Sequence, residues 1–438
     1  MDQANLHNPE YETMPRDELE QLQIERLQST LNRVYRNVAF YGTAFDAHGV
    51  NLERLKDMSA LRELPFTTKE DLQRSYPYDM FALPLRDIVR IHTTSGTTGK
   101  PIVVGYTQND LRDWRQCVAR LLTAAGVTEH DVVQIALHYS LFAEGFGFHQ
   151  GAEEIGASVI PASLATSVGR QIVVMRDFKT TVLISTPSHA LNIAAGLAEA
   201  QVHPERLFLK LGLFGGERWS ERLRGQLEEQ LRITAIDTYG PTEVMGPGVA
   251  GECHLRQGLH INEDHFIVEI IDPKTLAPVP AGDEGELVLT TISKEGFPLI
   301  RYRTGDITRI EPEPCPCGRT FVRVARMMGR TDDLILFQAV GFFPAQIEEI
   351  LGEFEGTSPY YQIVLDQEGG VETLQIRVEI SAQIPQLDEV KALEALQTQV
   401  AKRIKSALDV EARVILVEPG SLRQLANGTE RVVDRRPG

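Results

Sequence analysis

The chain has 438 residues, of which 42% are hydrophobic and 24% charged, an ordinary composition for a globular protein with an ample core. Its length fits one large domain with a smaller satellite, or about three domains. It carries 44 basic and 61 acidic residues, and this formal net charge of −17 argues against nucleic acid or an anionic membrane as the main partner.

The sequence shows no sign of export or of a membrane span. Residues 1–22 are acidic and polar, so we expect no signal peptide. No uninterrupted apolar run approaches the roughly 18 residues that a membrane-spanning helix needs. Four cysteines in so long a chain do not make a disulfide framework, which fits the reducing cytoplasm.

The predicted elements begin with a helix over residues 18–38. Its apolar residues recur near helical spacing, at Leu22, Ile24, Leu27, Leu31 and Val34. From about residue 131 to residue 239, the short apolar runs VVQIAL, TVLIST, RLFLKLGLF and ITAIDTY alternate with helix-like segments. Such alternation is typical of α/β layers around a largely parallel sheet.

The second half of the chain changes pattern twice. Between Phe266 and Ile310 the runs FIVEIID, GELVLTT and LIRYRTGDITRI are separated by Pro/Gly turns and indicate a β region. After Gly329 a smaller unit follows, in the order strand, helix, two strands, long helix and strand. We therefore predict an α/β protein with a large multi-subdomain N-terminal domain (residues 1–329), which has parallel sheets and a β subdomain, and a small αβ-sandwich C-terminal domain (residues 330–438).

The segment HTTSGTTGKPIVVGYT (residues 92–107) invites comparison with a Walker A phosphate loop, but the fit is poor. Walker A requires Ser or Thr after the lysine, and then a helix. Here Pro101 follows Lys100 and IVVGYT reads as a strand, so the loop lies between strands. It still offers close backbone approach, hydroxyl donors and a positive charge, from Ser95, Gly96, Thr97, Thr98, Gly99 and Lys100. We predict a phosphate-binding loop, the alternative being a plain Ser/Thr/Gly turn.

Three further motifs follow in order: TYGPTEVMGPG (residues 238–248), LIRYRTGDITRI with Asp306, and GRTDDLILF from Gly329. With SGTTGKP they resemble the ordered motif set of the adenylate-forming acyl/aryl-acid ligases. The segments PFTTKEDLQRSYPYDMFALP, GGERW, INEDHF and FFPAQIEEIL are closely similar to the phenylacetate–CoA ligases. This resemblance spans about Tyr11 to Asp434. It implies an AMP-forming acid–CoA ligase whose small C-terminal domain rotates between two half-reactions.

The resemblance implies a catalytic role for three motif residues. The first half-reaction joins a carboxylate to the α-phosphorus of ATP and expels pyrophosphate, so the site needs preorganised donors and a magnesium ion. The loop of residues 95–100 would close over the β- and γ-phosphates with Lys100. Thr242 would donate to the α-phosphate and Glu243 would hold magnesium. Taken singly, Glu243 also reads as a solvated turn carboxylate.

The resemblance also implies a nucleotide site for ATP and AMP. Asp306 matches the carboxylate that accepts both ribose hydroxyls, although alone it also reads as a turn cap, and Arg330 matches a second ribose contact. The adenine would be framed by Gly215, Gly216, Glu217, Asp237, Tyr239 and Gly240.

By the same resemblance, the segment HYSLFAEGFGFHQG (residues 138–151) would line a ring pocket for the acid. The expected lining comprises Leu137, Tyr139, Phe142, Phe148, Gly215 and Pro247. Leu137 stands where a tyrosine is expected and Phe148 where a small residue is expected, so the extra phenyl group would shorten or reshape the pocket. Alternatively, both side chains belong to the apolar core. We expect an aromatic acid, and the replacements at Leu137 and Phe148 argue against phenylacetate itself.

A second constellation consists of Cys253, His260, Cys315 and Cys317. Tetrahedral zinc binds three thiolates and one imidazole readily, and some relatives in this family carry such a site. We predict a structural zinc that ties loops of the β subdomain together. The alternatives are free reduced thiols, and His254 as the imidazole ligand. Cys117 lies in a helix-like segment and is expected in the core.

The C-terminal domain departs from the family pattern. Family members end in a segment resembling Pro-Arg-Ser-Glu-Gly-Lys, followed by Arg-Val-Ile-Asp, and its lysine reaches both the carboxylate and the α-phosphate. This chain has GSLRQLANGTERVVDRR instead, which puts Gly428 or Thr429 at the lysine position. Arg423 and Arg431 are candidate substitutes, but a planar guanidinium does not replace a point charge conservatively.

A second departure lies at residues 338 and 339. Gln338 and Ala339 replace the arginine and glycine expected in the loop that faces the N-terminal domain during thioester formation. This puts the thioester step in question as well.

Three functional hypotheses remain. The first is an acid–CoA ligase that is slow, or in which another group fills the role of the lysine. The second is an adenylate-forming enzyme that passes the acyl group to an amine or a carrier, as indoleacetate–lysine ligase does. The third is a weakened protein that binds a nucleotide or acyl-adenylate, against which the intact N-terminal motifs argue. We expect a cytoplasmic homodimer that uses a small carboxylic acid, ATP and either coenzyme A or an amine.

Overall fold

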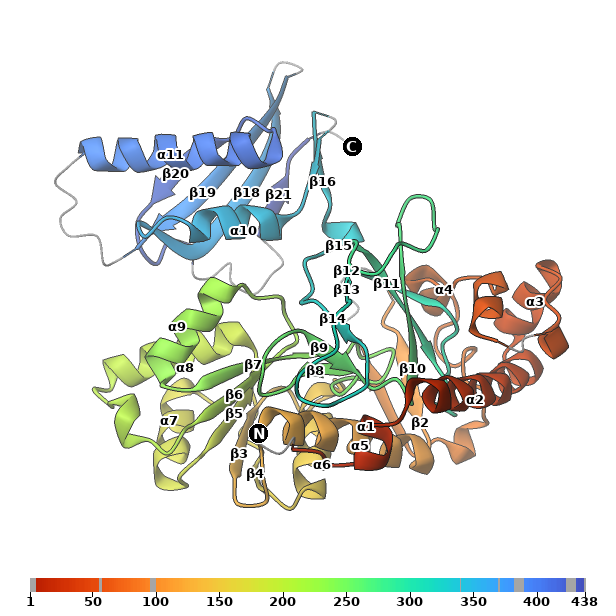
Figure 1. Cartoon of the computed structure of the whole chain (residues 1–438). Coiled ribbons are helices and arrows are strands. Elements are labelled where there is room, and N and C mark those ends of the chain that lie inside the picture. Colours follow the sequence, from red (N-terminus) through yellow and green to blue (C-terminus); the bar gives the residue numbers. More distant parts are fainter. Residues whose placement is uncertain are drawn as a thin grey trace. The chain divides into compact units, whose positions relative to one another are not determined.

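The computed structural model describes residues 5–54, 57–94, 100–338, 340–368, 371–381, 390–422 and 431–436. The chain forms two compact units, one of Met1–Arg218 with Leu227–Met327 and one of Trp219–Gln226 with Met328–Gly438 (Figure 1). Among the described helices, none combines the length and the apolar character that crossing a membrane requires.

A long helix, α2 (Arg16–Asn37), opens the first unit because its apolar residues fall on one face. Leu19, Leu27, Leu31 and Val34 are buried on this face. Shorter helical segments precede and follow it: α1 (Pro9–Glu12), α3 (Ala39–Ala47), η1 (Leu52–Arg54), η2 (Met58–Glu63), α4 (Lys69–Arg74) and η3 (Leu85–Asp87).

The main layer of the first unit is a large mixed sheet with the strand order β13-β14-β9-β8-β7-β6-β5-β3-β4. Its parallel part contains β3 (Val132–Ala136), β4 (Ser158–Ile160), β5 (Val182–Ser185), β6 (Leu211–Phe214) and β7 (Thr234–Tyr239). Its antiparallel extension contains β8 (Ala250–Glu252), β9 (Leu259–Ile261), β13 (Ile310–Glu311) and β14 (Arg323–Val324). The apolar runs predict the parallel part because central strands are buried on both faces.

Helices alternate with the parallel strands, as parallel crossovers require. They are α5 (Gln108–Ala125), α6 (Glu144–Glu154), α7 (Val168–Asp177), α8 (Pro187–Glu199), η4 (Pro204–Arg206) and α9 (Glu221–Leu231). Two helical pairs form, α5 with α6 and α7 with α8 (Figure 1). Helix α5 begins at a capping box, in which the Thr107 hydroxyl accepts from the Asp110 amide and the Asp110 carboxylate accepts from the Thr107 amide.

Two antiparallel sheets complete the first unit. The segment SGTTGKP joins β1 (Arg90–Thr93) to β2 (Val103–Tyr106), so the prediction of a loop between strands is confirmed, and residues 95–99 lie outside the described residues. The predicted β region contains the antiparallel strands β10 (Phe266–Ile271), β11 (Gly285–Thr291) and β12 (Tyr302–Thr308).

The second unit is a small αβ layer around its own apolar core. Its sheet has the order β20-β19-β18-β21, in which β18 and β19 form an antiparallel hairpin and the outer strands join in parallel. Side chains from both helices and the sheet share one core, including Ile347, Ile363, Ile376 and Val400. The elements are β15 (Gly329–Arg330), η5 (Thr331–Asp333), β16 (Ile335–Phe337), β17 (Val340–Phe342), α10 (Pro344–Gly352), β18 (Thr357–Glu368), β19 (Val371–Ile380), α11 (Val390–Leu408), β20 (Arg413–Val417) and β21 (Val432–Asp434).

The predicted α/β fold class is confirmed, with local corrections. Only the end of the run RLFLKLGLF forms a strand, β6. Strands β17 and β21 were not predicted, because three residues are too few to display a period of two. Between β16 and β17, Gln338 adopts a left-handed conformation, with φ of 48°, which costs a non-glycine residue about 1 kcal/mol.

A buried ion cluster ties the helices of the first unit to the connection between β9 and β10. The Asp264 carboxylate lies 2.7 Å from the Arg120 guanidinium and 3.2 Å from the imidazole of His265. Arg26 of α2 donates to the Asp264 carbonyl. Although burial opposes charge, Asp264 raises the pKa of His265 to about 10. The interactions of its two cationic neighbours lower the pKa of Asp264 despite burial.

Replacing Asp264 with Asn should destabilise the protein by about 3 kcal/mol, because the change leaves Arg120 charged and buried without its carboxylate and removes the partner that keeps His265 protonated. Thermal and urea unfolding measure this loss. In the wild type, the contribution of His265 is present below its unfolded pKa of about 6.5. It is lost as the pH rises through the folded pKa of about 10.

The matched control is Glu311→Gln, which removes a partly exposed partner of Arg309 and should change stability by less than about 1 kcal/mol. Equal stability of the Asp264 and Glu311 variants would show that the buried cluster does not contribute to stability as argued.

Candidate active site

The turn after β7, residues 240–248, is folded so tightly that glycine is required. A side chain at Gly240 would place its Cβ 1.8 Å from the carbonyl oxygen of Gly246. Gly246 and Gly248 have φ values of 96° and 99°, which favour glycine. The glycines of TYGPTEVMGPG therefore serve the shape of the turn, which carries the predicted catalytic residues.

Side chains from three different segments hold the carbonyls of the 240–248 turn. The Tyr106 hydroxyl of β2 donates to the Met245 carbonyl at 2.9 Å. The Trp114 indole of α5 donates to the Pro247 carbonyl at 2.7 Å. The rings of Tyr106 and Trp114 stack, with centroids 5.1 Å apart. The ammonium of Lys294, from the connection between β11 and β12, donates to the Val244 carbonyl at 2.7 Å.

Glu243 is oriented by β12. The hydroxyl of Tyr302, which is 1% exposed, donates to Glu243 Oε1 at 2.7 Å. Thr242 lies beside Glu243 and, like it, is half-buried. The structure thus presents a fixed carboxylate and a hydroxyl side by side on the turn, the donor set that a phosphate and a hard cation require.

Tyr239 and Asp306, predicted in separate motifs, are brought into contact. The Tyr239 hydroxyl donates to Asp306 Oδ2 at 2.6 Å. Burial and the adjacent Asp306 carboxylate raise the pKa of Tyr239, so it is a neutral donor near pH 7. The Asp306 amide donates to the Thr304 hydroxyl at 3.0 Å, which fixes the backbone beside the carboxylate.

The two carboxylates predicted to frame the adenine are hydrogen-bonded within the protein. Gly216 has φ of 79°, which turns the chain out of the sheet. The Glu217 carboxylate accepts from the Ser188 hydroxyl at 3.0 Å at the start of α8. The Asp237 carboxylate accepts from Arg326 at 2.9 Å. Both predicted adenine-framing carboxylates therefore already accept hydrogen bonds from protein groups.

Two predicted cations lie in different settings. Lys100 is exposed, and its ammonium lies 5.6 Å from the ring centroid of Tyr76. The loop residues before it, Ser95 to Gly99, lie outside the described residues. Arg330 belongs to the second unit, where its guanidinium lies 2.8 Å from the Asp332 carboxylate.

The predicted ring-pocket residues lie in different settings. Leu137 and Phe148 are each 3% exposed and belong to the main hydrophobic core. Helix α6 packs closely on Pro247, since a Cβ at Gly147 would lie 2.6 Å from the Pro247 ring. Phe142 and Tyr139 make aromatic contacts, Phe142 with His138 at 5.7 Å between ring centroids and Tyr139 with His149 at 5.9 Å. A Cβ at Gly215 would lie 2.4 Å from Thr238 Oγ1, so this position accepts only glycine.

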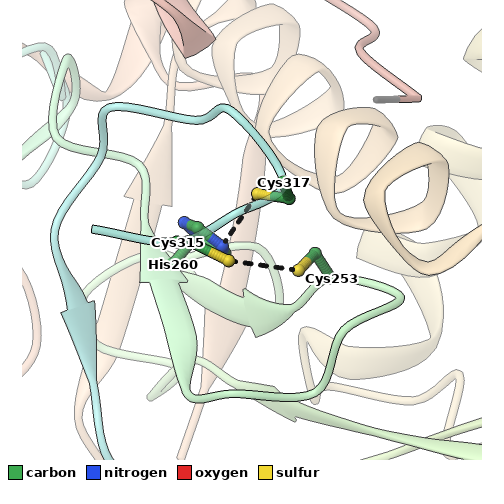
Figure 2. A group of neighbouring side chains, drawn as sticks. All are labelled: Cys253, His260, Cys315 and Cys317. Atoms are coloured by element: carbon green, nitrogen blue, oxygen red, sulfur yellow. Dashed lines mark hydrogen bonds between the residues drawn. The ribbon is translucent and has the colours of Figure 1, made fainter. Parts of the chain in front are cut away.

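The predicted metal ligands converge (Figure 2). The ligand atoms of Cys253, His260, Cys315 and Cys317 all lie within 4.8 Å of one another, and the residues are buried. Cys253 follows β8, His260 lies in β9, and the other two cysteines lie between β13 and β14. His254 is exposed and is not part of this group, and Cys117 is buried in α5 as expected.

The spacing of this group suits a tetrahedral ion. With zinc about 2.3 Å from sulfur and about 2.0 Å from nitrogen, tetrahedral edges are about 3.8 Å between sulfurs and about 3.5 Å between sulfur and nitrogen. The sulfurs of Cys253 and Cys315 are 3.9 Å apart, and the Cys317 sulfur lies 3.5 Å from His260 Nε2. Hydrogen bonding from Cys253, together with His260, lowers the pKa of Cys317 and so favours a thiolate ligand.

Sequence reasoning missed the residues that support the turn. Tyr302 and Asp306 are both in β12, four residues apart, and an even separation puts them on one face of a strand. That spacing inside LIRYRTGD was a usable signal for Tyr302. No sequence signal indicated Lys294, because a single lysine in a loop belongs to no pattern. Burial lowers its pKa to about 7, against the opposing charges of Asp110 and Glu243.

Family models match most of the chain. The model described as AMP-binding enzyme matches residues 21–293, and the model described as AMP-binding enzyme C-terminal domain matches residues 339–436.

The chain belongs to the AMP-binding enzyme family.

Within this family of AMP-binding enzymes, the chain is similar to phenylacetate–coenzyme A ligases along nearly its whole length. It is 42% identical to the one from Aromatoleum evansii over 97% of this chain and 96% of that protein. It is 41% identical to the one from Thermus thermophilus over 98% of this chain and all of that protein, and 42% identical to the one from Escherichia coli. These relatives make it a phenylacetate–CoA ligase-like member of the family.

A solved structure supports the same fold. The structure of 2-hydroxyisobutyryl-CoA ligase in the postadenylation state, in complex with 2-HIB-AMP, matches with a TM-score of 0.90. The two chains are 26% identical, and the match covers 99% of this chain and 93% of that one.

Proposed function

We propose that this AMP-binding enzyme is an AMP-forming acid–CoA ligase. It activates a carboxylic acid with ATP to an acyl-adenylate and passes the acyl group to coenzyme A. The observation that carries the proposal is full-length similarity, at 41–42% identity, to proteins named phenylacetate–coenzyme A ligase. An amide-forming relative, fumarate–(S)-2,3-diaminopropanoate ligase, is only 23% identical over 84% of this chain, so an amine acceptor is less well supported.

In this proposal the two domains divide the work. Residues 1–329 bind ATP and the acid, and residues 330–438 form the domain that moves between the half-reactions. The compact core of the second unit, with its own sheet and helices, suits a domain that moves as a body.

In the first half-reaction, a carboxylate oxygen of the acid attacks the α-phosphorus of ATP, the bond to the β-phosphate breaks, and pyrophosphate leaves with the electron pair. Thr242 would donate to the α-phosphate, and Lys100 would place its charge beside the departing phosphates. Glu243 would hold magnesium, which neutralises phosphoryl charge when bound. Support for this role is that Tyr302 fixes the Glu243 carboxylate without the help of a ligand.

The nucleotide would be held further along β12, the strand that also carries Tyr302. Asp306 would accept from the ribose hydroxyls, while Tyr239 keeps its carboxylate in place through the 2.6 Å hydrogen bond. In the second half-reaction the sulfur of coenzyme A, having lost its proton, attacks the acyl carbon and AMP leaves. We further propose that the acid is aromatic, as the names of the relatives suggest.

Arg431 is one of the two residues considered as substitutes for the missing C-terminal lysine. Arg431 lies 3.2 Å from the Glu348 carboxylate, and its guanidinium lies over the Tyr361 ring, so it is engaged within the second unit. Arg423, Gly428 and Thr429 lie outside the described residues, as does Ala339.

We also propose a structural zinc at Cys253, His260, Cys315 and Cys317, supported by the tetrahedral spacing given above. Zinc would join β8 and β9 to the segment between β13 and β14 and would leave no ligand position open. The homodimer and the cytoplasmic location stay predictions.

The first test is acid-dependent ATP–pyrophosphate exchange and CoA thioester formation with a panel of aromatic and aliphatic carboxylates. Glu243→Gln and Lys100→Ala should each lower kcat/KM for adenylation by on the order of 10²-fold, since each removes one charged contact of the transition state. Glu284→Gln, at an exposed position of the β subdomain, is the matched control and should behave as the wild type. Unchanged kinetics in both site variants would contradict the assigned phosphate site.

Metal content tests the zinc proposal separately. Protein purified without added metal should contain about one zinc per chain, and Cys317→Ser should lose most of it and unfold at a lower temperature. Elemental analysis and thermal unfolding measure both effects. Cys117→Ser replaces a buried cysteine outside the group and should keep its zinc. Metal-free protein with four freely titratable thiols would refute the site.

The missing lysine predicts unequal half-reactions. Introducing lysine by Gly428→Lys or Thr429→Lys should raise pyrophosphate exchange, because a cation would again neutralise charge shared by the carboxylate and the α-phosphate. Consumption of a supplied acyl-adenylate by coenzyme A should not rise comparably, because that step does not use the lysine. A wild-type adenylation rate already in the usual enzyme range of about 1–10³ s⁻¹ would instead show that another cation serves.

A further inference from the structure

Lys294 is a buried cation beneath the 240–248 turn. It is 2% exposed, and its ammonium donates to the Val244 carbonyl at 2.7 Å and, more weakly, to the Glu243 carbonyl at 3.4 Å. The same ammonium lies 4.6 Å from the ring centroid of Tyr106 and 5.5 Å from that of Phe297. The cation therefore has ring faces and carbonyl oxygens around it.

The loop that carries Lys294 is anchored independently of the turn. The Asp110 carboxylate, which caps α5, accepts from the backbone amides of Glu295 at 2.6 Å and Gly296 at 2.9 Å. Because these two anchored amides directly follow Lys294 in the chain, the backbone from which the Lys294 side chain extends is held in place. Among the described residues no carboxylate lies in ion-pair contact with the ammonium, although the charges of Asp110 and Glu243 act on it.

A buried ammonium that contacts no carboxylate is costly, whereas an apolar side chain of similar length would avoid that cost and would leave the Val244 carbonyl without its donor. Positions that break a packing rule in this way tend to serve function. Glu243, the neighbour of Lys294, is held at two points. Tyr302 fixes its carboxylate and Lys294 fixes its backbone, and both residues come from the connection and strand that follow β11.

We propose that Lys294 is a positioning residue for adenylate formation, which holds the backbone of Glu243 and Val244 so that Thr242 and Glu243 face the phosphates of ATP. The proposal rests on the proposed function. It assigns Lys294 no contact with substrate. Its effect should be confined to the half-reaction in which phosphoryl charge develops at the turn.

The test starts both half-reactions from the same complex. Purified full-length protein is given the adenylate of the acid that the carboxylate panel identifies, with magnesium. It then receives either pyrophosphate, which forms ATP and releases the acid, or coenzyme A, which forms the thioester and releases AMP. Lys294→Met keeps the length of the side chain and removes its donor and charge. We expect ATP formation to fall by on the order of 10²-fold, the scale of one lost donor to developing charge. Thioester formation should fall by less than about 5-fold, because the phosphoryl charge that the turn must meet does not form in that step.

Lys274→Met makes the same change at an exposed lysine between β10 and β11 and should leave both half-reactions and the melting temperature unchanged. If Lys294→Met does not fold, the comparison is made with Lys294→Gln and decided by the same criteria. Equal loss of both half-reactions would make Lys294 a structural residue only and overturn the proposal, as would unchanged ATP formation. If the wild type forms neither product, the proposed function fails and this assignment falls with it.

Discussion

The carbonyl groups of the 240–248 turn need hydrogen-bond donors from within the protein, and several segments of the first unit supply them. The turn is so compact that a single Cβ at Gly240 would collide with the backbone of Gly246. Donors arrive from Tyr106, Trp114 and Lys294, which belong to β2, α5 and the connection between β11 and β12. Buried carbonyls are costly without partners, so these three segments are fixed relative to one another through the turn.

Strand β12 connects the 240–248 turn to the proposed nucleotide site. Tyr302 and Asp306 are four residues apart on one strand and contact Glu243 and Tyr239, which are four residues apart across the end of β7. The proposed magnesium and ribose sites are therefore spaced by the rise of a single strand. Strand β7 continues through β8 and β9 toward the cysteine and histidine group, so a metal there would brace the far side of the same sheet.

The sequence predicted elements with a clear period and motifs with a fixed order. Helix α2, the buried parallel strands and the convergence of Cys253, His260, Cys315 and Cys317 all fall in this class. Contacts between motifs were out of reach, because nothing local in TYGPTE or RTGD indicates that Tyr239 meets Asp306. Lys294 was missed for a related reason. The loop that carries it is anchored by Asp110, which lies far earlier in the chain, so its immediate sequence neighbours do not indicate its position. The order of the motifs sufficed for the family, but their contacts required the fold.

The positive charge available to the phosphates of ATP depends on the C-terminal lysine that this chain lacks. A lysine at position 428 or 429 would bring a mobile cation to the α-phosphate in one half-reaction and withdraw it in the other. Neither position holds a lysine, and Arg431 is engaged by Glu348 and Tyr361, so we expect adenylation to rely on donors fixed in the first unit. Fixed donors cannot withdraw, so they contact AMP equally before and after the domain moves. We therefore expect the loss of lysine at Gly428 or Thr429 to weaken the step in which phosphoryl charge forms. The thioester step does not use that lysine, and the replacements at Gln338 and Ala339 bear on it separately.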